Sequence, residues 1–271
     1  MSPRVELDSW YNHPEWVDIA FQEDTAREAD FVAAACEKYC DFPVRRLLEP
    51  ACGTGRLVRH LAARGCEVTG FDLSQPSLDW LQKELAKKRL SARTLRLDMT
   101  DFSLSDLGAK QPFDSAYCPF NSFRHLLSED AARQHLECMA RSIRPGGIYV
   151  LGFHLLPPDA EETSLERWSE ARGQKRVTVT LRVDGCDRRR RLERIHISLL
   201  ARQGESIVAR VKDEFDLRVY TAAQVRKLLK SVPALELIDV FDFWYDLEEP
   251  LQLNNELGDV VLVLRRVESK R

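Results

Sequence analysis

The chain has 271 residues, of which 44% are hydrophobic and 31% charged, and its formal net charge is -3 at pH 7. A chain of this length and composition can bury a sizeable core, and doubly wound α/β folds often reach this length as one domain. The small net charge argues against bulk electrostatic binding to nucleic acid or to an anionic membrane surface.

Neither the N-terminal segment nor the cysteines suggest an exported or membrane protein. Residues 1–16 have no basic stretch followed by an apolar run, and no segment approaches the apolar length of a membrane span. Seven cysteines are scattered without a CxxC pair, which argues against a zinc site. Cys36 and Cys40 share one helix face, and we interpret them as two buried thiols of the core in preference to a pair of metal ligands. We therefore expect a cytoplasmic protein with reduced, mostly buried thiols.

The first part of the chain alternates apolar runs with amphipathic segments. A helix is predicted at 24–40, followed by strands at 46–48, 66–72, 93–97, 113–118 and 146–153 and by helices at 57–64, 77–88 and 128–143. Alternating strands and helices predict a mostly parallel sheet covered on both faces, with the site at the carboxyl ends of the strands. Glu49, Asp72 and Asp98 would all lie along that edge.

From about residue 155 the pattern changes. Long β-like runs at 176–183, 189–200 and 205–219 are separated by turn signals at Asp184-Gly185 and at 202–204. They predict a small antiparallel β insert over 155–218. Thr221 then caps a helix to Lys230, and strands at 234–240 and 258–267 complete a seven-stranded sheet formed by 1–154 and 219–271.

The stretch LLEPACGTGR, residues 47–56, ends the first strand with Glu49 and turns through Gly53 and Gly55. A glycine turn before a helix N-terminus places backbone N–H groups at a ligand. Asp72, at the end of the next strand, suits the two hydroxyls of a ribose. Both features indicate a nucleoside, but the GxGxxG pattern of dinucleotide sites lacks its third glycine, which weakens the dinucleotide interpretation.

Five segments, EPACGTGR, GFDLS, LRLDMTDF, FDSAYCPFNSFRHL and IRPGGIYVLGF, occur in this order at the five strands. Together they resemble the successive motifs of class I S-adenosylmethionine-dependent methyltransferases. The resemblance covers roughly residues 45–154 together with 221–267. It implies a Rossmann-like α/β fold and an enzyme that uses S-adenosylmethionine and releases S-adenosylhomocysteine. Glu49 agrees with this, because a carboxylate suits the cofactor's ammonium and sulfonium charges better than a pyrophosphate.

The resemblance also implies which residues contact the cofactor. Glu49 and the glycine turn would line its methionine side, Asp72 would hold the ribose hydroxyls, and Asp98 would accept from the adenine amino group. Tyr11 lies in an aromatic segment, SWYNHPEWVDIAF, that resembles the lid of small-molecule methyltransferases, although packing of its rings is an equal alternative. The implied cofactor-binding residues are Tyr11, Glu49, Ala51, Gly53, Gly55, Asp72, Leu73, Asp98, Met99, Cys118, Phe120 and Asn121. For Arg56, contact with the cofactor and a position on the surface are equal alternatives.

No catalytic residue is identified from the sequence. His154 and His125 follow the fifth and fourth strands and, with Tyr11, are the candidates for a general base, His154 being preferred to His125. A strong base is optional, because an amine acceptor needs only to arrive neutral. Acids and histidines do not cluster at metal-ligating spacing, so no metal is predicted.

The acceptor is predicted to be a nitrogen or oxygen nucleophile of a small molecule. The fourth strand ends in Cys118-Pro119-Phe120-Asn121, which departs from the Asn/Asp-Pro-Pro-aromatic pattern of enzymes that methylate amino groups of nucleic-acid bases or protein side chains. The insert would roof the acceptor pocket or form a dimer contact, and a homo-oligomer is left open. No membrane partner is expected.

The insert is locally basic. Residues 171–220 hold 13 Lys and Arg against 7 Asp and Glu, with four arginines at 188–191. Solvated strands whose arginines protect exposed edges are preferred to a basic wall for an acidic substrate or RNA. Two alternative functions stay open: an RNA methyltransferase that uses the insert, and a non-catalytic cofactor-binding module of the same fold.

Overall fold

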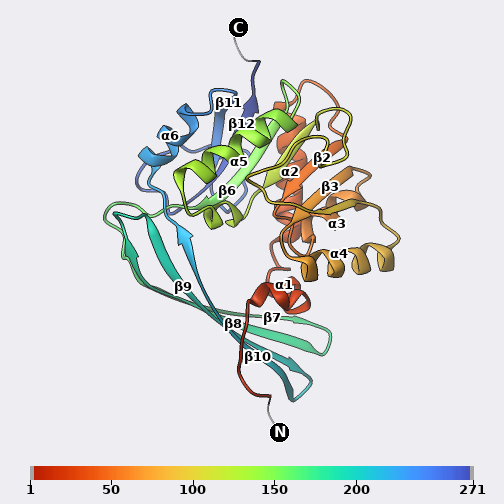
Figure 1. The fold of residues 1–271 in the computed structure, drawn as a ribbon, viewed down its shortest axis with the longest axis vertical. Helices are drawn as coiled ribbons and strands as arrows, with labels where there is room; N and C mark the ends of the chain where they lie inside the picture. Colours follow the sequence, from red (N-terminus) through yellow and green to blue (C-terminus); the bar gives the residue numbers. More distant parts are fainter. Residues whose placement is uncertain (1–2, 269–271) are drawn as a thin grey trace.

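The computed structural model describes residues 3–268, which form a seven-stranded and a five-stranded sheet (Figure 1). The larger sheet has the order β11-β12-β6-β5-β2-β3-β4, and its first five strands in the chain run parallel while β12 is antiparallel to both of its neighbours. Its strands are β2 (Arg46–Pro50), β3 (Glu67–Asp72), β4 (Arg93–Arg96), β5 (Ser115–Cys118), β6 (Ile148–His154), β11 (Leu235–Phe241) and β12 (Asp259–Arg266). The predicted mostly parallel seven-stranded sheet is confirmed.

Helices cover both faces of this sheet. Because strand side chains alternate, Leu47 and Leu48 of β2 belong to two separate apolar clusters. One cluster packs α2 (Thr25–Tyr39), α3 (Arg56–Ala63) and α4 (Gln75–Lys88), and the other packs α5 (Glu129–Ser142) and α6 (Ala222–Lys230). Thr221 caps α6 as predicted, since its hydroxyl accepts from the backbone N–H of Gln224. Every helix in the described range is too short or too polar to cross a bilayer.

The predicted antiparallel insert is the smaller sheet, which lies below the larger one in Figure 1. Its antiparallel strands are β7 (Ser164–Arg172), β8 (Lys175–Asp187), β9 (Leu192–Gln203) and β10 (Ser206–Arg218), and the short β1 (Glu6–Leu7) pairs in parallel with β10. Val177, Val179, Ile195 and Ile197 are buried on its inner face, whereas Arg194 and Lys212 lie on its outer face.

Two details of the insert differ from the prediction. The turn expected at Asp184-Gly185 is wrong: the chain continues through a bulge between Val183 and Cys186 and turns at residues 188–191, where Arg191 has a φ of +60°. Strand β7 was not predicted, because its only large apolar side chains are Leu165 and Trp168, so it lacks an apolar alternation.

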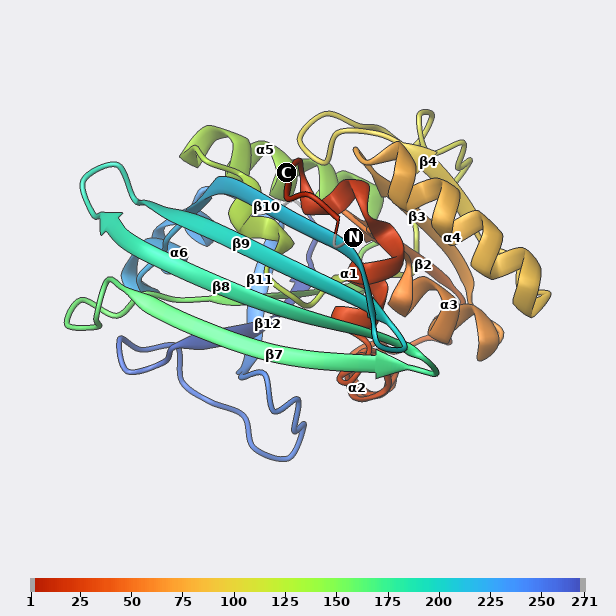
Figure 2. The ribbon, with the colours of Figure 1, turned by 90° about the horizontal axis from the view of Figure 1, so that it is seen from below.

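The N-terminal segment connects the two sheets. After the short 3-10 helix η1 (Trp10–Asn12), α1 (Pro14–Ala20) buries Ile19 in the apolar cluster of the smaller sheet, and the Trp168 indole donates to the Ala20 carbonyl at 2.9 Å. On the other side, Ser74 and Ser77 at the start of α4 donate to the Tyr11 carbonyl. Figure 2 shows the smaller sheet from below with α1 behind it. The aromatic segment therefore packs against the smaller sheet and also lies between the two sheets.

Candidate functional site

A cavity of about 750 Å³ lies between the carboxyl ends of the parallel strands and the inner face of the smaller sheet. Residues after β2, β3, β5 and β6 form its floor, the segment around Tyr11 forms one side, and β7 to β10 form its roof. Open α/β sheets bind ligands at this edge, where the strand order reverses between β2 and β5.

The cavity brings together all predicted cofactor-binding residues except Gly55 and Asp98. A Cβ on Gly55, whose φ is +69°, would lie 2.2 Å from a methyl carbon of Leu81, so this glycine is needed where α3 packs on α4. Asp98 is exposed, and its Oδ1 accepts from the backbone N–H and the hydroxyl of Thr100, both at 2.8 Å. The Asp98 carboxylate thus stabilises the turn that follows it, while its neighbour Met99 lines the cavity.

Glu49 ends β2 inside the cavity and is only 6% exposed. Its Oε2 has no hydrogen-bond partner among the described residues. Burial raises the pKa of this carboxyl to about 8, although the nearby Tyr117 hydroxyl and the charge of Arg56 lower it in part. An unpartnered buried carboxyl oxygen fits a cationic ligand group, because a bound ammonium would supply the missing donor and stabilise the carboxylate.

Asp72 joins two loops at the cavity floor. Its Oδ2 accepts from the backbone N–H of Gly53 and its Oδ1 from that of Ser74, both at 2.8 Å. Gly53 has a φ of +52°, and a Cβ there would meet nothing within 4 Å, so the glycine opens the turn toward the cavity. Each carboxylate oxygen of Asp72 keeps a further lone pair, which suits the two hydroxyls of a ribose. Burial raises the pKa of Asp72.

Arg56 lines the cavity, but both of its terminal nitrogens donate to the Glu28 carboxylate at 2.7 Å. Its positive charge is therefore balanced by a buried acid rather than directed at a ligand alone. The guanidinium also lies 5.9 Å from the centre of the Phe120 ring.

The three candidate catalytic residues all line the cavity. The Tyr11 hydroxyl and His125 Nε2 share a hydrogen bond of 2.9 Å, although these residues are 114 positions apart. His154 instead packs against Phe120 and Phe243 with ring centres 6.2 and 4.9 Å away. Burial, helped by the charge of Arg124, lowers the pKa of both histidines to about 4, and burial raises the pKa of Tyr11. All three are neutral at pH 7.

The roof contains residues that sequence reasoning missed. Its apolar part comes from Trp168, Leu181, Val183, Ile195, Ile197, Phe215 and Leu217, and its acids are Glu161, Glu162, Glu166 and Glu193. Alternation along the predicted strands shows that they have an apolar face, but it does not show what that face covers. No local signal in the sequence connects these strands with the ends of β2 and β3.

The basic residues of the insert point elsewhere. None of the 13 Lys and Arg side chains of residues 171–220 lines the cavity. On the outer face, Arg194 pairs with Glu214 at 3.2 Å and with Asp216 at 3.1 Å. This arrangement agrees with the preferred interpretation of solvated strands, although Arg194 lies on the central strand β9 and does not protect an edge.

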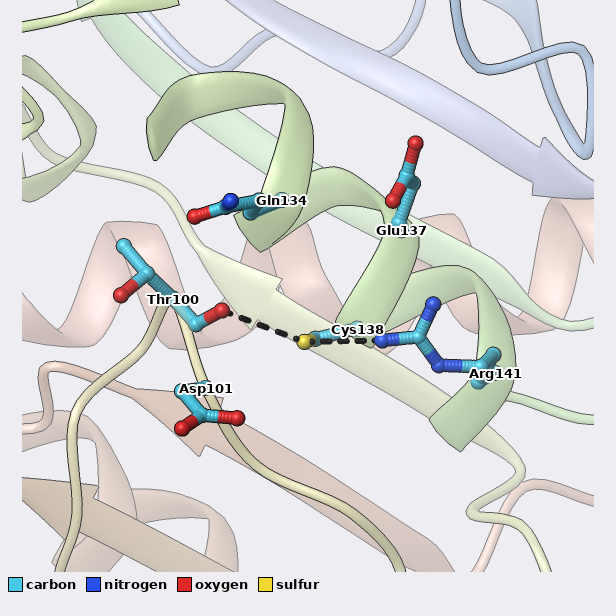
Figure 3. Close-up of a pocket in the computed structure, with 6 residues that line it drawn as sticks. All are labelled: Thr100, Asp101, Gln134, Glu137, Cys138 and Arg141. Carbon is cyan, nitrogen blue, oxygen red and sulfur yellow. Dashed lines mark hydrogen bonds between the residues drawn. The ribbon is translucent and has the colours of Figure 1, made fainter. Parts of the chain in front are cut away.

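A second hollow, of about 330 Å³, lies over α5 (Figure 3). The Arg141 guanidinium donates to Cys138 Sγ at 3.1 Å, and that thiol donates to the Thr100 carbonyl at 3.5 Å. The other lining residues are Asp101, Gln134 and Glu137. The Cys138 thiol thus accepts one hydrogen bond and donates another. None of the predicted site residues lines this hollow.

The remaining cysteines are consistent with core packing. Cys36 and Cys40 are both buried thiols, as predicted, and burial raises the pKa of Cys36 to about 12. Within residues 3–268, no three His, Cys, Asp or Glu side chains gather closely enough to hold a metal ion.

Fold and site together define a Rossmann-like protein with a nucleoside-sized, acid-lined cavity at the carboxyl edge of its sheet. A family profile described as "Methyltransferase domain" matches residues 47–147. This segment is less than half of the chain, and its match bears out the predicted resemblance to S-adenosylmethionine-dependent methyltransferases.

Curated relatives match over part of the chain. The dTDP-3-amino-3,6-dideoxy-alpha-D-glucopyranose N,N-dimethyltransferase of Streptomyces fradiae is 33% identical over 141 residues, which cover 51% of this chain and 51% of that protein. A ubiquinone biosynthesis O-methyltransferase of Dechloromonas aromatica is 30% identical over 109 residues, 40% of this chain and 43% of that protein. The chain thus spans about half the length of the curated relatives it matches.

Solved structures match the fold over nearly the whole chain. An S-adenosylmethionine-dependent methyltransferase from Clostridium acetobutylicum has a TM-score of 0.76 at 18% identity, covering 96% of this chain and 100% of that one. Streptomyces venezuelae DesVI has a TM-score of 0.75 at 18% identity, covering 97% of this chain and 100% of that one. The smaller sheet is therefore included in the shared fold.

Proposed function

We propose that this protein transfers a methyl group from S-adenosylmethionine to a nitrogen of a small molecule. The observation that carries this proposal is a pair of carboxyl groups, the buried Glu49 and the half-buried Asp72, at adjoining strand ends of one cavity. Glu49 lacks a donor and Asp72 retains free lone pairs, so the two fit the ammonium and the ribose of this cofactor. The matched methyltransferase segment contains both residues.

The other floor residues complete the proposed cofactor site. Ala51 and Gly53 would face the methionine part, Leu73 and Met99 would flank the adenine, and the loop from Cys118 to Asn121 would border the reactive methyl. The bound cofactor supplies a methyl group already activated by the sulfonium. The chain has to hold the acceptor in line with this methyl and keep water out, which the roof is placed to do.

The candidate bases favour nitrogen over oxygen as the acceptor atom. A hydroxyl must lose its proton as it attacks, whereas a neutral amine attacks with its own lone pair. His125 and His154, with pKa values of about 4, are weak bases and suit the second case. We propose that Tyr11 and His125, joined by their hydrogen bond, position the acceptor amine and that His154 packs the floor.

Residues 155–218 would then form the roof of the acceptor pocket. Support comes from the lining: Leu181, Ile197 and Phe215 belong to three different strands of this segment and face the cavity. Phe215 also packs against the His125 ring at 5.4 Å between ring centres. The named activity of the Streptomyces fradiae relative, N,N-dimethylation of an amino sugar, supports an amine acceptor of similar size.

We also propose a cytoplasmic location. All seven cysteines are free thiols, and at least five of them are buried, which suits a reducing compartment.

The test is calorimetric titration of the purified protein with S-adenosylmethionine and, separately, with NAD. We expect S-adenosylmethionine to bind and NAD not to bind. Asp72→Ala should weaken the binding at least about tenfold, since it removes charge-assisted hydrogen bonds. Asp98→Ala should weaken it less, because Asp98 is exposed and held by Thr100.

Asp79→Ala is the matched control, because Asp79 is an exposed aspartate on α4 that does not line the cavity. Its affinity should equal that of the unchanged protein. Binding of NAD in place of S-adenosylmethionine, or equal losses in the Asp72 and Asp79 variants, would contradict the cofactor assignment. Cofactor binding without methyl transfer to any amine would favour the non-catalytic alternative.

A further inference from the structure

The charges around the cavity are distributed in a way that the proposed function does not explain. Four glutamates, Glu161, Glu162, Glu166 and Glu193, line its roof, whereas the cations that line the cavity in the described chain are Arg56 and Arg124. Both arginines are already paired, Arg56 with Glu28 and Arg124 with Glu193. The cavity therefore has no cation left over for an anionic acceptor.

The acids nearest to solvent form a rim. Glu161, Glu162 and Glu166 are exposed, the first two in the stretch that leads into β7 and Glu166 on β7 itself, the outer strand of the roof. Arg188 pairs with Glu162 at 2.5 Å. Neither Glu161 nor Glu166 has an ion-pair partner among residues 3–268. These two carboxylates are free to meet a positively charged acceptor.

The inner end of the acceptor region has the opposite character. His125, His154 and Tyr11 are neutral there, and they adjoin Phe120 and Phe215. A neutral, aromatic environment beside a sulfonium favours the uncharged form of an amine, which is the form that attacks. The cavity is thus suited to a neutral reacting nitrogen inside and a positive charge at the rim.

This charge pattern disagrees with a nucleoside diphosphate. A pyrophosphate needs arginines, lysines or free helix N-terminal N–H groups, as in other phosphate sites. The insert holds 13 such cations, but none of them lines the cavity. The nucleotide part of an acceptor such as that named for the Streptomyces fradiae relative would meet carboxylates instead.

We infer that the acceptor is a phosphate-free molecule of amino-sugar size that carries a second positive charge, a diamine or polyamine held by Glu161 and Glu166 at the rim. This inference rests on the proposed methyltransferase function. It separates this protein from relatives that are named for nucleotide-linked sugars, because the same catalytic floor is combined with an acidic roof.

The experiment compares three probes in methyl-transfer assays: methyl 3-amino-3-deoxyglucoside, the corresponding 3,6-diamine and a dTDP-linked 3-amino sugar. We expect the highest kcat/KM for the diamine and the lowest for the nucleotide-linked amine. Glu161→Gln/Glu166→Gln should reduce kcat/KM for the diamine about twofold to fivefold for each carboxylate and leave the monoamine unchanged. Added salt should also reduce the advantage of the diamine in the unchanged protein.

Glu205→Gln is the matched control, since Glu205 is an exposed glutamate in the turn between β9 and β10 that does not line the cavity. Preference for the nucleotide-linked probe, methylation of none of the probes, or an undiminished diamine advantage in the double variant would overturn the inference. Calorimetry with S-adenosylmethionine, run on the same samples, distinguishes this outcome from failure of the proposed function, which would show as absent cofactor binding.

Discussion

Glu49 shows how much of the site depends on a single residue. Sequence reasoning places this carboxyl beside a cationic cofactor, and the structure adds that it is buried with an unpartnered Oε2. Burial raises its pKa from 4.5 to about 8, so the folded protein holds a proton that the unfolded chain releases between these values. The contribution of Glu49 to stability therefore declines as the pH rises through this window.

Cofactor binding should show the opposite pH dependence. A bound ammonium needs the carboxylate, so binding releases the Glu49 proton, and affinity for S-adenosylmethionine should rise between about pH 6 and pH 8, by up to about tenfold per pH unit. Glu49→Gln should lose affinity and most of this pH dependence while becoming more stable than the unchanged protein at pH 8. Calorimetry and urea unfolding across this range measure both effects, and a pH-independent affinity in the unchanged protein would refute the assignment.

At the scale of elements, the sequence predicts most of the structure where local patterns are sufficient. The parallel strands, their helices and the Thr221 cap all follow from periodicity and capping residues. Strand β7 could not be predicted, because an exposed edge strand needs no apolar alternation. The β1 strand has two exposed residues and exists only because β10 lies beside it.

The residues of the site also divide into those that local patterns predict and those that they do not. Glu49, Gly53 and Asp72 are predictable because the first two lie in the motif at the end of β2 and Asp72 lies in the motif at the end of β3. The pairing of Tyr11 with His125 and the acids of the roof depend on how distant segments pack, which no local pattern encodes. The ranking of His154 above His125 also rested on chain position alone, and the structure gives His125 the closer polar partner.

Helix α1 is held between the sheets by a buried charge cluster that yields a prediction about stability. The Asp18 carboxylate is fully buried and accepts from Arg59 on α3 and from Arg172 on β7. Asp18→Asn should lower the free energy of unfolding by about 3 kcal/mol, because it leaves Arg59, only 7% exposed, with the weaker partner Glu84 at 3.5 Å. Urea unfolding followed by tryptophan fluorescence measures this change.

Arg172→Gln is the comparison for the same cluster. The Arg172 side chain is 41% exposed, so water replaces much of what its ion pair provides. The loss should be below about 1 kcal/mol. Equal losses in the Asp18 and Arg172 variants would show that the cluster is not dominated by its buried pair.

Across the whole molecule, the two faces of the smaller sheet carry different charges. The inner face presents apolar side chains and the carboxylates of Glu166 and Glu193 to the cavity, and its Arg172 pairs with Asp18 of α1. Other arginines of the insert, such as Arg182 and Arg194, lie on the outer face, and four more form the turn at 188–191. Since strand side chains alternate, one sheet can carry both patterns. The outer-face arginines are therefore separated from the proposed methyl-transfer site by the thickness of this sheet, whereas the turn at 188–191 adjoins the cavity rim through the pair of Arg188 with Glu162.

This separation predicts that RNA is not a methyl acceptor, whatever its affinity for the outer face. Radiolabelled methyl incorporation into total cellular RNA should stay at background, because none of the Lys and Arg residues of the insert lines the cavity to hold a phosphate there. Arg189→Ala/Arg190→Ala, two exposed arginines of the turn, should weaken RNA retention at low salt and leave turnover of a small amine unchanged. Methyl incorporation into RNA that disappears in this variant would instead establish the RNA methyltransferase alternative, since it would require the arginines of the turn to deliver a substrate to the cavity.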